Sequence, residues 1–247
     1  MPEVTDERPT PAQGPLTGVA TGLHSSTDRF PAWRRPTEGE QRWWVALSIL
    51  LVVVLQSLLP QRFTIHPRFL LQAIEFAALV ALVVTHPERM SKRTKGVRAA
   101  SQTLLAFVAV TNVISVVLLI HQITSGGKIP ATELLLGGAE IWFTNAMVFA
   151  LWYWEYDRGG PASRARGDAE IPDFLFPQMT DDKLAANWEP IFMDYLFMSY
   201  TNSTAFSPTD TLPLSRWAKA LFMAQSAISL VTVALIAARA VNILPGS

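Results

Sequence analysis

The 247-residue chain contains no cysteine, which excludes disulfide bonds, thiolate metal sites, iron–sulfur ligation and cysteine nucleophiles. Histidine is scarce, and its four copies are scattered without the spacing that metal sites use. Phosphate-binding loops, dinucleotide fingerprints and nucleophile elbows are absent from the sequence. These absences predict that the protein is not an enzyme and that it has neither a metal site nor a cofactor.

Charged residues are also few, at 16% of the chain, whereas about 25% is usual in soluble proteins. Lys+Arg and Asp+Glu balance at 20 each, so the chain has no overall basic field for nucleic acid. Half of the residues are apolar, and they gather in long runs of the length that a bilayer requires, about 20 residues. The sequence therefore predicts an all-α, polytopic transmembrane helical bundle whose first partner is the lipid bilayer.

Five apolar runs are long enough to be full spans, and they cover residues 43–59, 69–85, 99–120, 134–154 and 220–238. Pro60 follows the first run, and Pro87 follows the second. A further stretch at about 191–206 is marginal in length and polarity. It is either a short re-entrant helix or a sixth span.

Lys and Arg in the connecting segments predict the orientation of the bundle. Arginines precede the first run, a dense basic run occupies 89–98, and the segment after the fourth run is again basic, whereas the intervening loops carry fewer cations. The positive-inside rule then gives an inner (plasma) membrane protein with a cytoplasmic N-terminus.

The same patterns divide the chain into four parts. A Pro- and Gly-rich segment, 1–42, is expected to be disordered in the cytoplasm. A four-span region covers 43–156, a cytoplasmic loop covers 157–190, and a hairpin of short helix, loop and last span covers 191–247.

Polar residues inside the apolar runs are the candidate functional groups, because such residues are costly in lipid and face the bundle interior or a water-filled cavity. They are Gln72, Glu75, Asn112, Glu140, Asn145 and Asp194. Glu75 and Glu140 have two readings: an ion or proton path, or an inter-helix hydrogen bond made by a protonated carboxyl group. Asp194 lies near the start of its stretch, where it is also suited to cap the following helix.

The stretch 194–243 resembles the pore module of the potassium-channel superfamily, in which a short pore helix leads into a carbonyl filter and a long inner helix. In an ungapped comparison, the aromatic stretch 196–200 falls on the end of the pore helix, and Pro213 and Arg216 also match the pattern. The pore-like segment consists of Thr204, Ala205, Phe206, Ser207, Pro208, Thr209 and Asp210. Ser207 and Thr209 stand where the family filter has glycines, so the resemblance implies a non-standard, degenerate filter.

The whole chain also resembles an uncharacterised bacterial multi-span membrane family, a domain of unknown function. Together the resemblances imply an ion channel-like or transport protein for monovalent cations, assembled as a homo-oligomer, either a dimer or a tetramer. The alternative is a non-conducting membrane scaffold or sensor subunit that keeps a pore-like fold. The charge pattern opens the re-entrant segment toward the cytoplasm, whereas the channel family opens it outward.

Overall fold

The structure is a computed structural model that describes residues 30–41, 43–64, 67, 72–77, 80, 95–125, 129–168, 171–204 and 210–243. Most of the predicted span 69–85 and the basic run 89–98 lie outside these residues. So do residues 1–29 of the predicted disordered segment and five of the pore-like residues, Ala205, Phe206, Ser207, Pro208 and Thr209.

The described chain is mostly helical, which confirms the all-α prediction at this coarse level. The helices are α1 (Trp43–Leu58), α3 (Lys95–Thr124), α4 (Ala131–Tyr156), α5 (Pro161–Arg166), α6 (Asp182–Ala185), α7 (Phe192–Thr204) and α8 (Arg216–Ile243). Short 3₁₀ turns are η2 (Ala32–Arg34), η3 (Gln61–Phe63), η4 (Asp157–Gly159) and η5 (Pro177–Thr180), and two short strands are β1 (Phe174–Leu175) and β2 (Leu212–Pro213). Prolines mark several boundaries: Pro60 follows α1, Pro130 caps α4, and Pro161 opens α5, where a missing N–H costs nothing.

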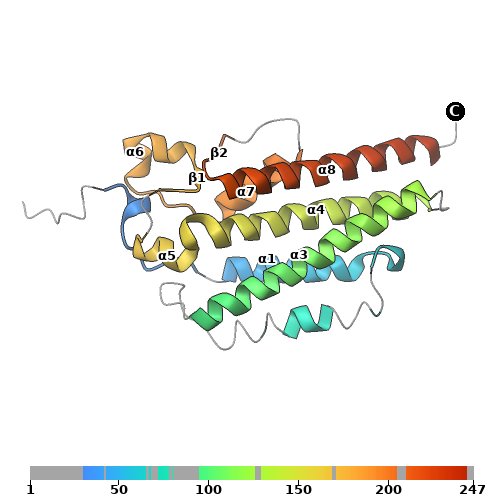
Figure 1. Ribbon diagram of the computed structural model, residues 1–247, viewed down its shortest axis with the longest axis horizontal. Coiled ribbons are helices and arrows are strands. Elements are labelled where there is room, and N and C mark those ends of the chain that lie inside the picture. The colour runs from blue at the N-terminus through green and yellow to red at the C-terminus, as the bar shows by residue number, and fades with distance from the viewer. Residues whose placement is uncertain are drawn as a thin grey trace, which may run out of the picture.

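Helix α4 is the central element, with α1 and α3 on one side and α7 and α8 on the other (Figure 1). Helix α8 runs antiparallel to α4 over its whole length. The rings of Trp217 and Tyr156 pack at one end with centroids 6.0 Å apart. At the other end, a Cβ added to Gly138 would lie 2.2 Å from Ile236 Cδ1. A glycine at this position lets the two helices approach closely, as small residues do in membrane bundles.

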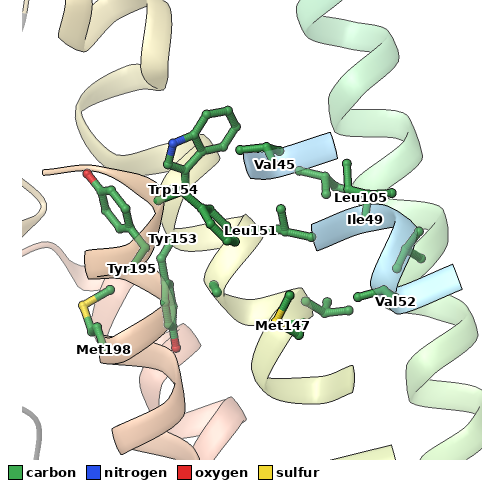
Figure 2. Packing of buried hydrophobic residues seen from close by; sticks show 14 of the residues in the cluster. Val45, Ile49, Val52, Leu105, Met147, Leu151, Tyr153, Trp154, Tyr195 and Met198 are labelled. Atoms are coloured by element: carbon green, nitrogen blue, oxygen red, sulfur yellow. The ribbon is translucent and has the colours of Figure 1, made fainter. Parts of the chain in front are cut away.

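The core is continuous across α4. Figure 2 shows Val45 and Ile49 of α1 directed toward Leu151 of α4, with Tyr195 and Met198 of α7 on the opposite side of that helix. A second cluster forms at the far end around Phe63, Leu119 and Leu134. The Phe63 ring packs directly against Gly137 of α4. The contact is so close that a Cβ at Gly137 would lie only 2.9 Å from the ring.

By length and composition, three helical stretches within the described residues are able to cross a membrane: Arg98–Thr124, Ala131–Arg166 and Arg216–Arg239. Helix α1 is apolar but shorter, with 16 residues. Large apolar side chains project outward from these helices, including Leu136 and Met223, which are 70% and 72% exposed. An outward apolar surface of this kind suits a lipid environment.

Helix α7 is half the length of α4 and α8, and its start and the strand β2 that follows it in the sequence lie at the same end of the bundle. It starts beside Trp154, near the end of α4, and its last turn reaches Trp142, whose Nε1 donates to Ser203 O at 3.3 Å. The chain then returns to β2, which pairs antiparallel with β1 (Phe174 with Pro213) at the end where α7 began. Within the described residues, the helix of the stretch 191–206 thus ends partway along α4.

The turn after α4 has a demanding backbone. Arg158, Gly159 and Gly160 all have positive φ, at 51°, 77° and 95°. A Cβ at Gly160 would lie 2.7 Å from the carbonyl oxygen of Glu155. Only glycine fits there, because both the dihedral angles and the contact exclude a side chain.

We expect Gly160→Ala to lower the free energy of unfolding by about 1–3 kcal/mol, the usual range for a strained backbone position. Gly96→Ala is the matched control, because a Cβ at Gly96, in the first turn of α3, meets no atom within 4 Å. Denaturant titration of both variants in detergent measures the difference. Equal stability of the two variants would contradict the assigned turn geometry.

Candidate functional site

The side-chain amide of Gln225, on α8, is a buried hydrogen-bonding centre between three helices. Its Nε2 lies 2.6 Å from Ser199 Oγ and 2.7 Å from Ser203 Oγ, both on α7. Its Oε1 accepts hydrogen bonds from Tyr153 Oη at 2.6 Å and from Asn202 Nδ2 at 2.8 Å. The amide therefore joins α8 to α7 and to α4 with both its donor and its acceptor in use.

A second polar contact crosses the bundle next to it. Asn112 of α3 donates to Asn145 of α4 at 3.4 Å, and Asn145 donates to Ser229 of α8 at 3.3 Å. All three side chains are buried. The structure thus brings together Asn112 and Asn145, two of the residues that the sequence singles out.

Gln72 and Glu75 lie in a helical segment, 72–77, that packs against α1 and α3. Thr111 Oγ1 of α3 donates to Glu75 Oε1 at 3.1 Å, and Gln72 Nε2 donates to the backbone oxygen of Gln56 at 2.9 Å. Gln56 Nε2 in turn donates to Thr111 Oγ1 at 3.3 Å. These four side chains form one group, which we term the Glu75 cluster.

The remaining sequence candidates do not join these groups. Glu140 is half-buried on α4, and its Oε1 has no hydrogen-bond partner among the described residues. Asp194 Oδ2 accepts from the backbone N–H of Ile191 at 2.8 Å, so this carboxylate caps the start of α7. Thr204 donates back to Thr201 O at 2.7 Å in the last turn of α7, and Asp210 is exposed on the return segment.

The sequence analysis missed Gln225, Ser199, Ser203 and Ser229, although a signal was available. The buried polar residues of α8 are Gln225, Ser229 and Thr232, which fall at i, i+4 and i+7 on one helix face. Most of the remaining residues of this helix are apolar, and several of them, including Met223, Leu230 and Val231, are exposed. A helix that buries its polar stripe and exposes its apolar face has the reverse of the pattern of a soluble helix, as expected in lipid.

A dense set of charged contacts closes the end of the bundle where α7 enters. The Asp157 carboxylate, fully buried, accepts from Tyr195 Oη at 2.6 Å and from the backbone N–H of Asp173 at 3.0 Å. Asp173 accepts in turn from Arg158 N at 2.8 Å and from Trp217 Nε1 at 2.9 Å. The Asp157 and Asp173 carboxylates therefore connect the end of α4, the start of α8, β1 and α7.

The segment 30–41 also packs against this end, although the sequence predicts disorder throughout 1–42. Trp33 is buried, and its backbone oxygen accepts from Arg158 Nη1 at 2.5 Å. Glu40 accepts from Trp154 Nε1 and from the backbone N–H of Phe192, both at 2.6 Å. The structure differs from the prediction because Trp33 and Glu40 contact residues in distant parts of the chain. Such contacts cannot be predicted from local composition.

No grouping of three or more His, Asp or Glu side chains suited to a metal ion occurs in the part of the chain that the structure describes. In comparisons with known proteins, no family model, no curated protein and no solved structure matches the chain.

Burial raises the pKa of the Glu40 carboxyl above its ordinary value of 4.5, against the opposing effects of the Phe192 and Trp154 hydrogen bonds and of Arg164. The folded protein consequently binds this proton more tightly than the unfolded chain. That contribution to stability is fully present below pH 4.5 and is lost as the pH rises through the raised pKa.

We therefore expect the stability of the Glu40→Gln variant relative to the wild type to improve as the pH rises above 4.5. Unfolding titrations across that range measure the difference. Asp210→Asn is the control, because Asp210 is exposed and is not among the groups that act on the Glu40 carboxyl. A constant difference between Glu40→Gln and the wild type at all pH values would refute the proton linkage.

Proposed function

We propose that the protein is a multi-pass inner-membrane transport protein, channel-like in its C-terminal hairpin, that moves monovalent cations along the buried polar face between α4, α7 and α8. The observation that carries this proposal is a half-length helix, α7, whose deep end contacts Gln225 inside the bundle. Discontinuous or re-entrant helices occur at membrane depth only where they are buried in protein or line a water-filled cavity. In many transporters such helices form the substrate and ion site.

The proposed topology has five full spans, with 69–85 as the second, a cytoplasmic N-terminus and a re-entrant α7. This topology is supported by the positions of segment 30–41, α5, α6 and β1, which all lie at one end of the bundle (Figure 1). The basic segments before α1 and after α4 then meet on one side, as the positive-inside rule requires.

This topology predicts which residues face the same side of the membrane. Because the chain has no cysteine, single-cysteine variants report their own positions. Lys183→Cys and Asp210→Cys, both exposed at the α7 entrance end, should react with an impermeant thiol reagent from the cytoplasmic side only. Ser125→Cys, exposed at the opposite end of α3, should react from the outside only. Labelling of positions 183 and 210 from opposite sides would eliminate the re-entrant arrangement.

Flux tests the transport activity itself. Purified protein in liposomes should carry K⁺, Na⁺ or H⁺ faster than empty liposomes, and Gln225→Leu should reduce the flux roughly tenfold, equivalent to about 1.4 kcal/mol in barrier height. Gln225→Glu keeps the size and the acceptor, its protonated form keeps a donor, and the hydroxyls of Ser199 and Ser203 can donate to its ionised form, so it should fold and alter the selectivity among these cations. The control is Ser57→Ala, because Ser57 bonds only within its own helix, to Val53 O.

One observation favours the alternative function, a non-conducting scaffold or sensor subunit. The hydrogen-bonding groups of Gln225 are all engaged within the chain, and Tyr195 and Met198 of α7 are fully buried against α4. A rigid, fully paired helix of this kind also suits a structural role. Well-folded protein that carries none of the three cations would contradict transport and favour this alternative.

A further inference from the structure

The Glu75 cluster contains two buried acceptor atoms that lack a donor. Glu75 is fully buried, and while its Oε1 accepts from Thr111, its Oε2 has no hydrogen-bond partner among the described residues. Gln72 Oε1 is likewise buried, with no partner among the residues that the structure describes. Residues three apart on a helix share a face, so these two side chains are neighbours.

Among the described residues packed around the cluster, no cation accounts for the carboxylate. The helical segment 72–77 carries no ionisable side chain besides Glu75, and α1 contributes Gln56 but has no ionisable residue between Trp43 and Leu58. On α3 the ionisable residues lie only at the two ends, Lys95 and Arg98 at the start and His121 in the last turn, whereas Thr111 is in the middle.

An unpaired carboxylate in such surroundings is costly, and in practice the charge is neutralised. One proton on Glu75 Oε2 meets both deficits: it removes the charge and supplies the donor that Gln72 Oε1 lacks. A metal ion fits less well, because hard cations take about six oxygen ligands. The described cluster offers the Glu75 carboxylate, the Gln72 amide oxygen and the Thr111 hydroxyl.

We propose that Glu75 is a proton-binding site, with Gln72 accepting the hydrogen bond of the protonated carboxyl group and Thr111 holding its other oxygen. In this site Glu75 takes up one proton and becomes neutral, and it releases the same proton when it becomes a carboxylate. Proton binding stands on the cluster alone. The role of that proton as the coupling ion of the carrier rests on the proposed transport function.

The site has a physical connection to the proposed path. Thr111 and Asn112 are consecutive on α3. Thr111 bonds to Glu75, and Asn112 bonds to Asn145. Asn145 in turn donates to Ser229 of α8. A change in the charge of Glu75 therefore acts on a helix that also contacts the α4–α8 polar face.

Infrared difference spectra of the reconstituted full-length protein, recorded between acidic and alkaline pH, test proton binding. The wild type should give the carbonyl band of a protonated carboxylic acid, shifted in heavy water. Glu75→Gln should remove this band, and Glu140→Gln should keep it. A band that persists in Glu75→Gln, or that Glu140→Gln removes instead, overturns the assignment.

A second measurement needs no variant and so does not depend on folding of Glu75→Gln. A hydrophobic carbodiimide, which attacks protonated carboxyl groups, should modify Glu75 of the wild type at a rate that falls as the pH rises, as read by mass spectrometry. Protection by Na⁺ at constant pH would overturn the proposal, because it would identify Na⁺ as the occupant. Absence of labelling at every pH would also overturn it.

Coupling is tested separately in liposomes. An imposed pH gradient should drive flux in the wild type, and Glu75→Gln should abolish the response to the gradient. Unchanged gradient-driven flux in Glu75→Gln overturns the coupling role. If the wild type shows no flux of any kind but keeps the infrared band, the transport proposal fails while the proton site stands.

Discussion

The amide of Gln225 is the interaction on which the arrangement of the C-terminal half depends. A helix that stops partway through a bundle exposes the carbonyl groups of its last turn, and hydrocarbon offers no donors to satisfy them. In this chain α7 ends between α4 and α8, where Trp142 Nε1 donates to Ser203 O at 3.3 Å and Ser226 Oγ donates to Asn202 O at 3.4 Å. Gln225 Nε2 holds the same turn through the hydroxyls of Ser199 and Ser203. The hydroxyl groups of Thr201 and Thr204 bond back to carbonyls of their own helix. The half-length helix is therefore tolerated because its neighbours and its own side chains provide the donors.

The contacts at the end of the bundle where α7 begins have a different role, which is to return the chain from the end of α4 to the start of α7. Asp157 and Asp173 do this with backbone N–H groups and the hydroxyl and indole donors of Tyr195 and Trp217. The Asp157 carboxylate is fully buried, and the Arg158 guanidinium balances its charge, with Nε 3.6 Å from Oδ2. Loss of Arg158 would therefore leave a buried charge uncompensated, and such losses are expensive. The positive φ angles at Arg158 and Gly160 belong to the same turn, which bends the chain sharply enough for Arg164 to donate back to Trp154 O.

Local sequence signals were sufficient for the helices and insufficient for the contacts between them. Proline positions and apolar run lengths predict α1, α3, α4 and α8 to within a few residues, because these features act within one segment. The point at which α7 ends along α4 and the burial of Trp33 and Glu40 depend on partners far away in the chain, such as Phe192 for Glu40. The intramembrane carboxylates were found because charge in an apolar run is conspicuous. Gln225 was missed because a single uncharged amide does not stand out in a long apolar run.

The two polar groups of the bundle differ in a way that bears on how each could work. Around Gln225, each donor and acceptor that the structure describes has a partner, so that group fixes α7 in place and can open only by exchanging hydrogen bonds. Within the described part of the chain, the Glu75 cluster keeps two acceptors without donors, so its state depends on a proton from outside. A charge change is worth far more in a low-dielectric interior than a rearrangement of neutral hydrogen bonds. The asymmetry places the group that responds to a proton at Glu75, which is connected through α3 and Asn145 to Ser229, on the same face of α8 as Gln225.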